Sequence, residues 1–268
     1  MENNKIKSTL KNVPQTMLIP LRARYLETKK TDGIISDPKS VEIFDRIECD
    51  FSGKKEVSRG SQMGVAIRTE ILDELTTQFL SQHDDAVVVN LGCGLDTRFH
   101  RLDNGTVTWF DLDVSEAIDL RKNFFKETDR HKFISRSVLD FSWEKQVPKG
   151  SPTLFIAEGL LMYFSEFEVK SLLKTIEDNF PGAEMILEAM SPFIAKRTDR
   201  HPDVKKYNAP FKWGIKTGKE IDAWDTGANF ITEYYFFDRH KNKQSPVFRF
   251  LALFPGFRKM MKIIHLRF

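Results

Sequence analysis

Two glycines one residue apart stand at the end of an apolar run, in the segment VVVNLGCGLDTR that covers residues 87–98. The run VVVNL is typical of a buried strand, and Gly92 and Gly94 would form the turn that follows it. A glycine at such a turn lets the backbone come close to a ligand, because no side chain stands in the way. The segment therefore predicts a binding site whose ligand has to be identified from the surrounding residues.

A dinucleotide is the first candidate for this ligand. Gly92, Gly94 and an acidic residue roughly twenty positions further on partly match the dinucleotide fingerprint G-x-G-x-x-G. Thr97 stands in place of the third glycine, which is the one that lets the helix approach the strand. The mismatch favours a ligand that carries an adenosine but no pyrophosphate.

S-adenosylmethionine is such a ligand, and its ribose needs a carboxylate after the second strand to accept its two hydroxyl groups. The segment FDLDV offers Asp111 and Asp113 at that place. Only one of the two is expected to reach the ribose easily, and the other could cap the helix that begins near Ser115.

The adenine and the methionine part of this ligand require further side chains. SVLDFSW offers Asp140 for the adenine amino group and Phe141 for a face of the ring. The methionine carboxylate needs a cation, and a guanidinium can bind it bidentately, which makes Arg68 and Arg98 the two candidates. Glu158 lies in an otherwise apolar strand, where an unpaired carboxylate would be costly to bury. We therefore expect Glu158 to face the ammonium and sulfonium of the ligand.

The elements that must position these residues follow two patterns. Residues 15–80 read as helices for most of their length, whereas strand-like and helix-like segments alternate from residue 85. Apolar strands such as VVVNL, TLFIAEG and MILEAM suit a parallel sheet covered by helices on both faces. Residues 193–227 are less regular and could fold over the carboxyl ends of the sheet, where ligands of open α/β sheets bind.

We therefore expect one domain with a doubly wound, Rossmann-like α/β fold. It would consist of an N-terminal helical cap (1–84), a cofactor-binding core (85–192) and a substrate-side insertion with the last strands (193–268).

Composition limits the class of protein. The 268 residues, 41% of them hydrophobic, are enough for one large core, and no apolar run is long enough to span a membrane. The first residues lack the apolar core of a secretory signal, so we expect a cytoplasmic protein without a membrane partner.

Cys49 and Cys93 are too few for a disulfide framework and are expected to be reduced. A formal net charge of +3 is weak for a nucleic-acid binder, which favours a small molecule or a protein as substrate.

Taken in order, the segments VVVNLGCGLDTRFHRLDNG, WFDLDV, SVLDFSW and AEGLLMYF resemble the motifs of the leucine carboxyl methyltransferase superfamily. They are most similar to the branch named after the tetracenomycin carboxyl O-methyltransferase of polyketide biosynthesis. The likeness covers most of the chain, including IPLRARYLET, SQMGVAIRTEILD and FPGAEMILEAMSP. It implies the class I methyltransferase fold, S-adenosylmethionine as cofactor and O-methylation, commonly of a carboxylate.

The resemblance also implies roles for individual residues. Carried over one by one, the family's cofactor cluster falls on Arg68, Gly92, Gly94, the acidic pair with Asp113 favoured, Asp140 and Glu158. Tyr163 matches the family as well, and we assign it a catalytic place near the methyl group.

The need for a general base depends on the acceptor. A carboxylate is already ionised near neutral pH, so alignment and removal of water suffice. A phenol would need a base, for which His100 and Tyr163 are the candidates. An exocyclic amine of a nucleic-acid base is disfavoured, because enzymes of that kind commonly carry a polar-Pro-Pro-aromatic motif where this chain has AEGLLMYF.

The sequence thus predicts an S-adenosylmethionine-dependent O-methyltransferase that acts on a carboxylate of a polyketide-like or other acidic small molecule. Three alternatives stay open at this point. They are methylation of a protein C-terminal carboxylate, cofactor binding without catalysis and, more distantly, a nicotinamide-dependent dehydrogenase.

Overall fold

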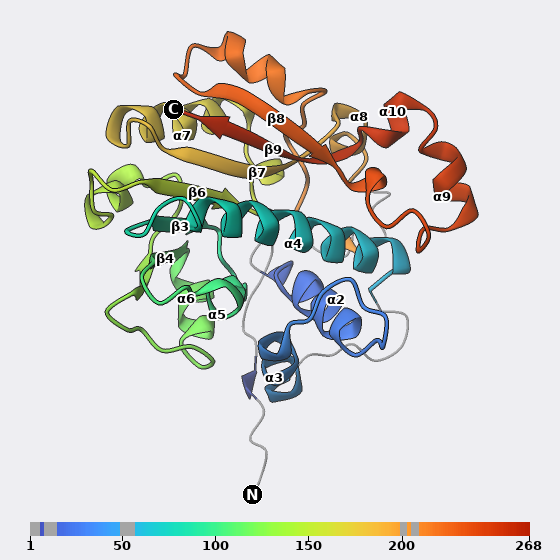
Figure 1. Cartoon of the computed structure of the whole chain (residues 1–268), viewed down its shortest axis with the longest axis horizontal. Helices are drawn as coiled ribbons and strands as arrows, with labels where there is room; N and C mark the ends of the chain where they lie inside the picture. The colour runs from blue at the N-terminus through green and yellow to red at the C-terminus, as the bar shows by residue number, and fades with distance from the viewer. Residues whose placement is uncertain (1–5, 8–14, 49–56, 199–202, 205–208) are drawn as a thin grey trace, which may run out of the picture.

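The computed structural model describes residues 6–7, 15–48, 57–198, 203–204 and 209–268. Its centre is a seven-stranded sheet with the strand order β5-β4-β3-β6-β7-β9-β8 (Figure 1). The strands are β3 (Val87–Leu91), β4 (Thr108–Asp113), β5 (His131–Ser135), β6 (Thr153–Ala157), β7 (Glu184–Met190), β8 (Asn229–Tyr235) and β9 (Met261–Arg267). Strands β3 to β7 pair in parallel, and β9 is antiparallel to both of its neighbours. The doubly wound α/β fold predicted from the sequence is confirmed.

The central strands form because their side chains are apolar on both faces. Every residue of β3 and of β6 is buried, as a strand covered by helices on both sides requires. Val87 and Val89 pack in the cluster on one face of the sheet, whereas Val88 packs in the cluster on the other. The strand order reverses between β3 and β6, because the chain continues from β3 to β4 on one side and from β6 to β7 on the other. Ligands of open α/β sheets bind at such a point.

Helices cover both faces of the sheet. α4 (Arg59–Leu80) and α5 (Arg98–Leu102) pack on one face through residues such as Ile71, Leu72 and Phe99. α7 (Glu166–Asn179) packs on the other face through Val169 and Leu172. The remaining α-helices are α2 (Leu18–Thr28), α3 (Pro38–Arg46), α6 (Ser115–Arg121), α8 (Pro192–Ala195), α9 (Pro246–Leu251) and α10 (Pro255–Arg258).

Short elements complete the described chain. The 3-10 helices are η1 (Phe141–Gln146), η2 (Leu161–Tyr163), η5 (Gly218–Trp224) and η6 (Phe236–Asp238), and β1 (Ile6–Lys7) pairs with β2 (Ile47–Glu48). Local sequence signals fix several helix starts. Asp37 caps α3 ahead of Pro38, Ser58 caps α4, and Ser165 with Glu168 forms a capping box at α7.

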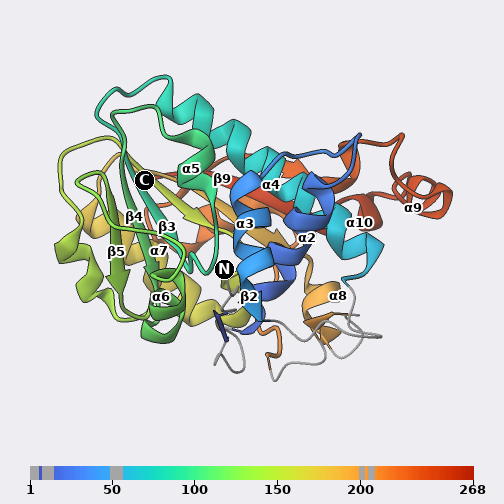
Figure 2. The same cartoon turned by 90° about the horizontal axis from the view of Figure 1, so that it is seen from below.

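The N-terminal helices lie beside α4 at one end of the sheet. α2 packs against both α3 and α4, and the two cartoon views agree on this arrangement (Figures 1 and 2). The capped end of α4 and the whole of α2 thereby lie near the carboxyl ends of the central strands. No helix of the described residues is long and apolar enough to cross a membrane.

Candidate functional site

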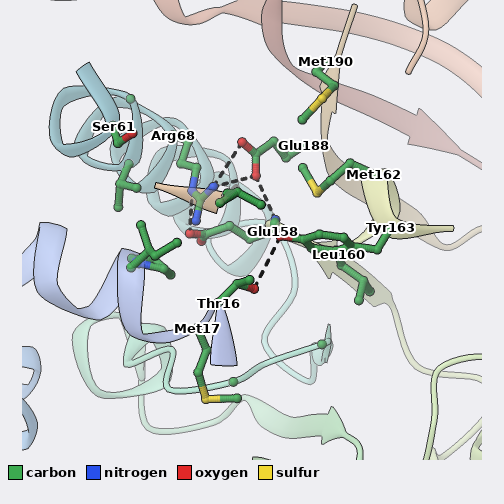
Figure 3. Close-up of a pocket in the computed structure, with 18 of the residues that line it drawn as sticks. Thr16, Met17, Ser61, Arg68, Glu158, Leu160, Met162, Tyr163, Glu188 and Met190 are labelled. Carbon is green, nitrogen blue, oxygen red and sulfur yellow. Dashed lines mark hydrogen bonds and ion pairs between the residues drawn. The ribbon is translucent and has the colours of Figure 1, made fainter. Parts of the chain in front are cut away.

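A cavity of about 900 Å³ lies where the carboxyl ends of the parallel strands meet the N-terminal helices (Figure 3). Its floor consists of the segments that follow β3, β4, β5 and β6, and its roof comes from α2 and the first half of α4. The polar and glycine residues that line it are Thr16, Arg24, Ser58, Gly60, Ser61, Gly64, Arg68, Asn90, Gly92, Gly94, Asp96, Asp113, Ser137, Glu158, Gly159, Tyr163, Glu168, Glu188, Lys212 and Gln244. Cys93 also lines the cavity as a free thiol, whereas Cys49 lies outside the described residues.

The predicted glycine turn lines this cavity. Gly92 and Gly94 have φ angles of 64° and 47°, which glycine adopts without strain. A Cβ at Gly92 would lie 2.7 Å from a methyl carbon of Leu160, and one at Gly94 would lie 3.1 Å from Cβ of Met17. The turn thus needs glycine for its conformation and for its surroundings, and it presents backbone to the cavity.

Asp113 ends β4 at the cavity and has spare hydrogen-bonding capacity. Its carboxylate accepts one bond from the Gly94 N–H at 2.8 Å and one from the Val114 N–H at 2.8 Å. Within the described residues no cation pairs with it, and burial raises its pKa to about 6 although both N–H groups act in the opposite direction. A carboxylate of this kind is stabilised further when hydroxyl groups donate to its free lone pairs.

The structure does not bring Asp111 to the cavity. It lies two residues before Asp113, and therefore on the same face of β4, but deeper along the strand. Its oxygens are taken by Arg121, His131, Asn90 and the Trp109 indole, and it is fully buried. The prediction that Asp111 shares the cofactor site is wrong. Neither aspartate caps α6, because its N-cap is Val114, without a side-chain cap.

Arg68 and Glu158 both line the cavity, where they bind each other. Arg68 Nε lies 2.8 Å from Glu158 Oε1, and its Nη1 lies 2.9 Å from Glu188 Oε2 (Figure 3). Burial would raise the pKa of Glu158, but Arg68 and Arg98 outweigh it and hold this pKa below its usual value. The expected charged partner of Glu158 is thus supplied by the protein itself.

Arg98 lies behind the cavity wall. Its side chain is fully buried and pairs with Asp73 at 2.7 Å, Asp96 at 2.5 Å and Glu158 at 2.7 Å. With three carboxylates around it and no surface on the cavity, it is not available to a ligand carboxylate. Of the two predicted arginines, the structure leaves Arg68 at the cavity.

The two residues predicted to meet the adenine are not on the cavity wall. Asp140 is exposed, caps η1 by accepting the Ser142 N–H, and pairs with Arg136 at 2.9 Å. Phe141 packs against the core on the α7 face of the sheet. Their neighbours Val138 and Leu139 line the cavity instead. The structure therefore does not place Asp140 and Phe141 at the cavity, although the segment that contains them borders it.

Tyr163 lines the cavity and is 8% exposed, with its hydroxyl 3.4 Å from Thr16 Oγ1 (Figure 3). Burial raises the pKa of this phenol, so it stays neutral near pH 7. His100 is exposed and stacks on Phe125, and it does not line the cavity. Partial desolvation of its ring and, after it, the nearby His131 lower its pKa. The structure therefore does not place His100 where a general base is needed.

Sequence reasoning missed five charged residues of this wall, which are Arg24, Asp96, Glu168, Glu188 and Lys212. Glu188 in β7 carried the signal used for Glu158, a lone carboxylate inside an apolar strand, and it also accepts the Gly159 N–H at 2.8 Å. Asp96 lies within the quoted glycine segment and accepts from Asn90 at 3.0 Å. Arg24 reaches the cavity from α2, where it pairs with Asp37 and donates to the Leu95 carbonyl. No feature of its local sequence predicts that position.

These residues fit S-adenosylmethionine as a cofactor. Gly92 and Gly94 form a cradle that any side chain would fill, Asp113 has acceptor capacity to spare, and the Arg68 guanidinium lines the cavity while paired with Glu158 and Glu188. The cavity is also large enough for a nucleoside-sized ligand and a second molecule together.

Comparison with known proteins agrees with this site. The family model described as leucine carboxyl methyltransferase matches residues 18–177. The tetracenomycin polyketide synthesis O-methyltransferase TcmP of Streptomyces glaucescens is 31% identical over 85% of this chain and 85% of its own.

Solved structures share the fold at lower identity. An S-adenosylmethionine-dependent methyltransferase of Mesorhizobium loti aligns with a TM-score of 0.53 and 13% identity, over 72% of this chain and 96% of that one. The N-methyltransferase NodS of Bradyrhizobium japonicum, in complex with S-adenosyl-L-homocysteine, aligns with a TM-score of 0.50 and 12% identity, over 96% and 98% of the two chains. The chain belongs to the leucine carboxyl methyltransferase family and is an S-adenosylmethionine-dependent methyltransferase.

Proposed function

We propose that the enzyme methylates a carboxylate oxygen of a largely apolar, polyketide-like small molecule. The observation that carries this proposal is a large apolar region of the cavity, beside the cofactor residues, in which no described histidine is placed to act as a base. When bound, S-adenosylmethionine supplies a methyl group on a positively charged sulfur. The protein's own residues bind the acceptor, orient it and exclude water.

The apolar region suits a rigid hydrophobic acceptor. Residues 193–240 contribute Ile194, Val204, Phe211, Phe236 and Phe237 to it, which supports a substrate-side role for this part of the chain. Large apolar residues from other parts of the chain are Met63, Met162, Phe164, Met190, Phe248 and Met261. Methionine and phenylalanine side chains of this kind adapt to flat or irregular apolar ligands.

The polar groups near this region favour an acidic acceptor with a few hydroxyl groups. Lys212 lies on the cavity wall next to Phe211 and offers a positive charge to a carboxylate. Gln244 is buried, and its side-chain nitrogen donates to the carbonyls of Phe237 and Arg239, which orients the amide. Its side-chain oxygen has no partner among the described residues and can accept a hydrogen bond from an acceptor hydroxyl.

The titration states support a carboxylate rather than a phenol. Tyr163 holds its proton more tightly than a free phenol, so it serves as a hydrogen-bond donor and not as a base. Glu158 and Glu188 are occupied by Arg68, and Asp96 by Arg98. An ionised carboxylate needs no proton removed, and holding it in line with water excluded lowers the barrier by as much as ~7–11 kcal/mol.

The family relation points in the same direction. The name of the relative TcmP describes O-methylation in the synthesis of a polyketide, and the family name describes a carboxyl acceptor. We expect a related acceptor here, with the acceptor carboxylate near Tyr163 and Lys212.

The test is methyl transfer from S-adenosylmethionine labelled in its methyl group into an extract of the source cells, followed by mild base. Carboxyl methyl esters then release volatile methanol, whereas phenol ethers and N-methyl groups keep the label. We expect volatile label, and we expect it to derive from a small-molecule fraction. Label that is incorporated but stays in place would contradict the carboxylate acceptor, and volatile label from the protein fraction would identify a protein carboxylate instead.

Two glycine variants show that the label passes through the proposed site. Gly94→Val should abolish incorporation, because a branched side chain at a φ of 47° collides with Met17 and closes the cradle. Gly105→Val is the matched control, since Gly105 also has a positive φ but lies on the surface with no atom near its added Cβ. Equal incorporation by both variants would refute the site.

A further inference from the structure

The segment formed by α9 and α10 exposes apolar side chains. Of the eight large apolar residues that the described part of the chain exposes, five fall between residues 247 and 254. They are Val247, Phe248, Phe250, Leu253 and Phe254, which together we call the α9–α10 patch, and their exposure reaches 75% at Leu253. No residue of either helix is buried, and both helices project from the body in the two cartoon views (Figures 1 and 2).

The C-terminal segment that carries the patch is rich in cations. Residues 239–268 contain eight lysines and arginines and no aspartate or glutamate, so the rest of the chain is net acidic. Arg239, Lys243 and Arg258 are paired with carboxylates of other segments. The remaining cations next to the patch, Lys241, Arg249 and Lys259, are exposed and have no carboxylate within 4.0 Å among the described residues.

The patch is continuous with the wall of the cavity. The Phe248 ring lines the cavity and also belongs to the patch, and it lies 6.1 Å from the Phe237 ring, measured between centroids. Phe257 of α10 lies 4.6 Å from Phe237 and 5.9 Å from Phe248 by the same measure. An aromatic cluster thus joins the exposed helices to the cavity.

We propose that the α9–α10 patch docks on the surface of an anionic lipid bilayer. Exposed phenylalanine and leucine side chains between unpaired cations are the combination that binds the interface of an anionic membrane without spanning it. A two-fold contact with a second copy fits less well, because it would bring the three unpaired cations against their own symmetry mates. The sequence argument against a membrane partner concerned only spanning segments, which such docking does not need.

Co-sedimentation with lipid vesicles tests this proposal and requires neither cofactor nor acceptor, so it is independent of the proposed reaction. We expect binding to vesicles of phosphatidylcholine mixed with phosphatidylglycerol, weaker binding to pure phosphatidylcholine, and loss of the difference at high salt. The double variant Phe250→Ser/Leu253→Ser should reduce binding by about tenfold or more, because both side chains would lose their burial in the interface. Phe167→Ser on α7 removes an equally exposed phenylalanine elsewhere and should bind like the unmodified protein.

A charge variant tests the other half of the proposal. Lys241→Gln/Arg249→Gln/Lys259→Gln should lower binding to the anionic vesicles about tenfold or more and leave binding to pure phosphatidylcholine unchanged. A variant with Lys122, Lys126 and Lys145 changed to Gln removes the same charge away from the patch and should keep the preference for anionic lipid. All of these positions are exposed, and a thermal melt checks that each variant is folded.

Two results would overturn the proposal. One is the absence of binding to anionic vesicles at low salt, or equal binding by the protein and its double variant. The other is a stable dimer in sedimentation velocity that dissociates in the Phe250→Ser/Leu253→Ser variant, together with no binding of the unmodified protein to vesicles. That result would assign the patch to a second copy.

Discussion

Asp111 and Asp113 show how position decides the role of a carboxylate. Both lie on the same face of β4, two residues apart. Arg121 and His131 surround Asp111, so its pKa stays below the usual value in spite of complete burial. The Asp111 carboxylate therefore stabilises the fold and does not bind a ligand. Asp113 has two backbone N–H partners and no cation, so burial raises its pKa to about 6 and leaves it able to bind a ligand.

This difference predicts a pH-dependent affinity for S-adenosylhomocysteine. Below about pH 6 the Asp113 carboxyl of the free protein is protonated and has lost the charge that favours hydroxyl donors. Affinity should therefore fall as the pH is lowered through about 6. Asp113→Ala should weaken binding at pH 7.5 or above by about 1–3 kcal/mol, roughly five- to 150-fold in Kd, and should lose this pH dependence. Isothermal titration calorimetry over a pH series measures both effects.

Asp119→Asn is the control for this prediction, because Asp119 is exposed on α6 and does not line the cavity. It should bind with the affinity and pH profile of the unmodified protein. The same pH profile in Asp113→Ala would mean that another group controls binding.

At the residue level the sequence predicted positions that depend on backbone geometry better than positions that depend on the ion pairs of long side chains. Gly92, Gly94 and Asp113 follow from the strand, the turn and the end of the next strand. The sequence could not decide whether Arg68 or Arg98 lines the cavity, because only the fold shows that Asp73 and Asp96 pair with Arg98. Asp140 was misplaced because η1 begins at that point and turns its side chain outward to cap the helix.

At the level of elements, Arg98 connects three parts of the fold that surround the cavity. From α5 it reaches Asp73 on α4, Asp96 in the glycine segment and Glu158 after β6. The Arg98 side chain is completely buried, whereas the side chains of its three partners are 10–19% exposed. The Arg98 guanidinium thus connects α4 and α5 to the segments that follow β3 and β6.

Arg98→Met should accordingly destabilise the protein by about 3–5 kcal/mol, since it removes a fully buried cation and leaves Asp96 without its close ionic partner, whereas Glu158 and Asp73 keep Arg68 and Arg101. Urea unfolding followed by circular dichroism measures this change. Arg130→Met is the matched control, because Arg130 pairs with Asp103 at the surface, where solvent screens the interaction, and its loss should change stability little. Equal midpoints for the two variants would show that the Arg98 cluster contributes no more than a surface pair.

The elements themselves were largely predictable. The strands from β3 to β9 and the helices α2, α3, α4, α6 and α7 follow from apolar periodicity, and α3 and α7 also have caps that are visible in the sequence. The helices beyond Pro192 were not predicted, because α8, α9 and α10 are too short to show a period.

At the level of the whole molecule, the cavity and the α9–α10 patch adjoin at Phe248, which belongs to both. Phe250, Leu253 and Phe254 of the patch do not line the cavity. Ligands of the two surfaces should therefore protect different segments of the backbone from hydrogen exchange.

We predict two separate footprints in hydrogen exchange followed by mass spectrometry. S-adenosylhomocysteine should slow exchange in residues 92–96 and 158–163, because binding there restricts the opening of the turn and of the segment after β6. Anionic vesicles should slow exchange in residues 249–259 and leave the glycine turn unchanged. The part of α7 after Glu168 does not line the cavity and packs on the other face of the sheet from α4, so it should respond to neither and serves as the internal reference. Protection of the glycine turn by vesicles alone would place the lipid surface over the cavity instead of on α9 and α10, and the two sites would then have to be regarded as one.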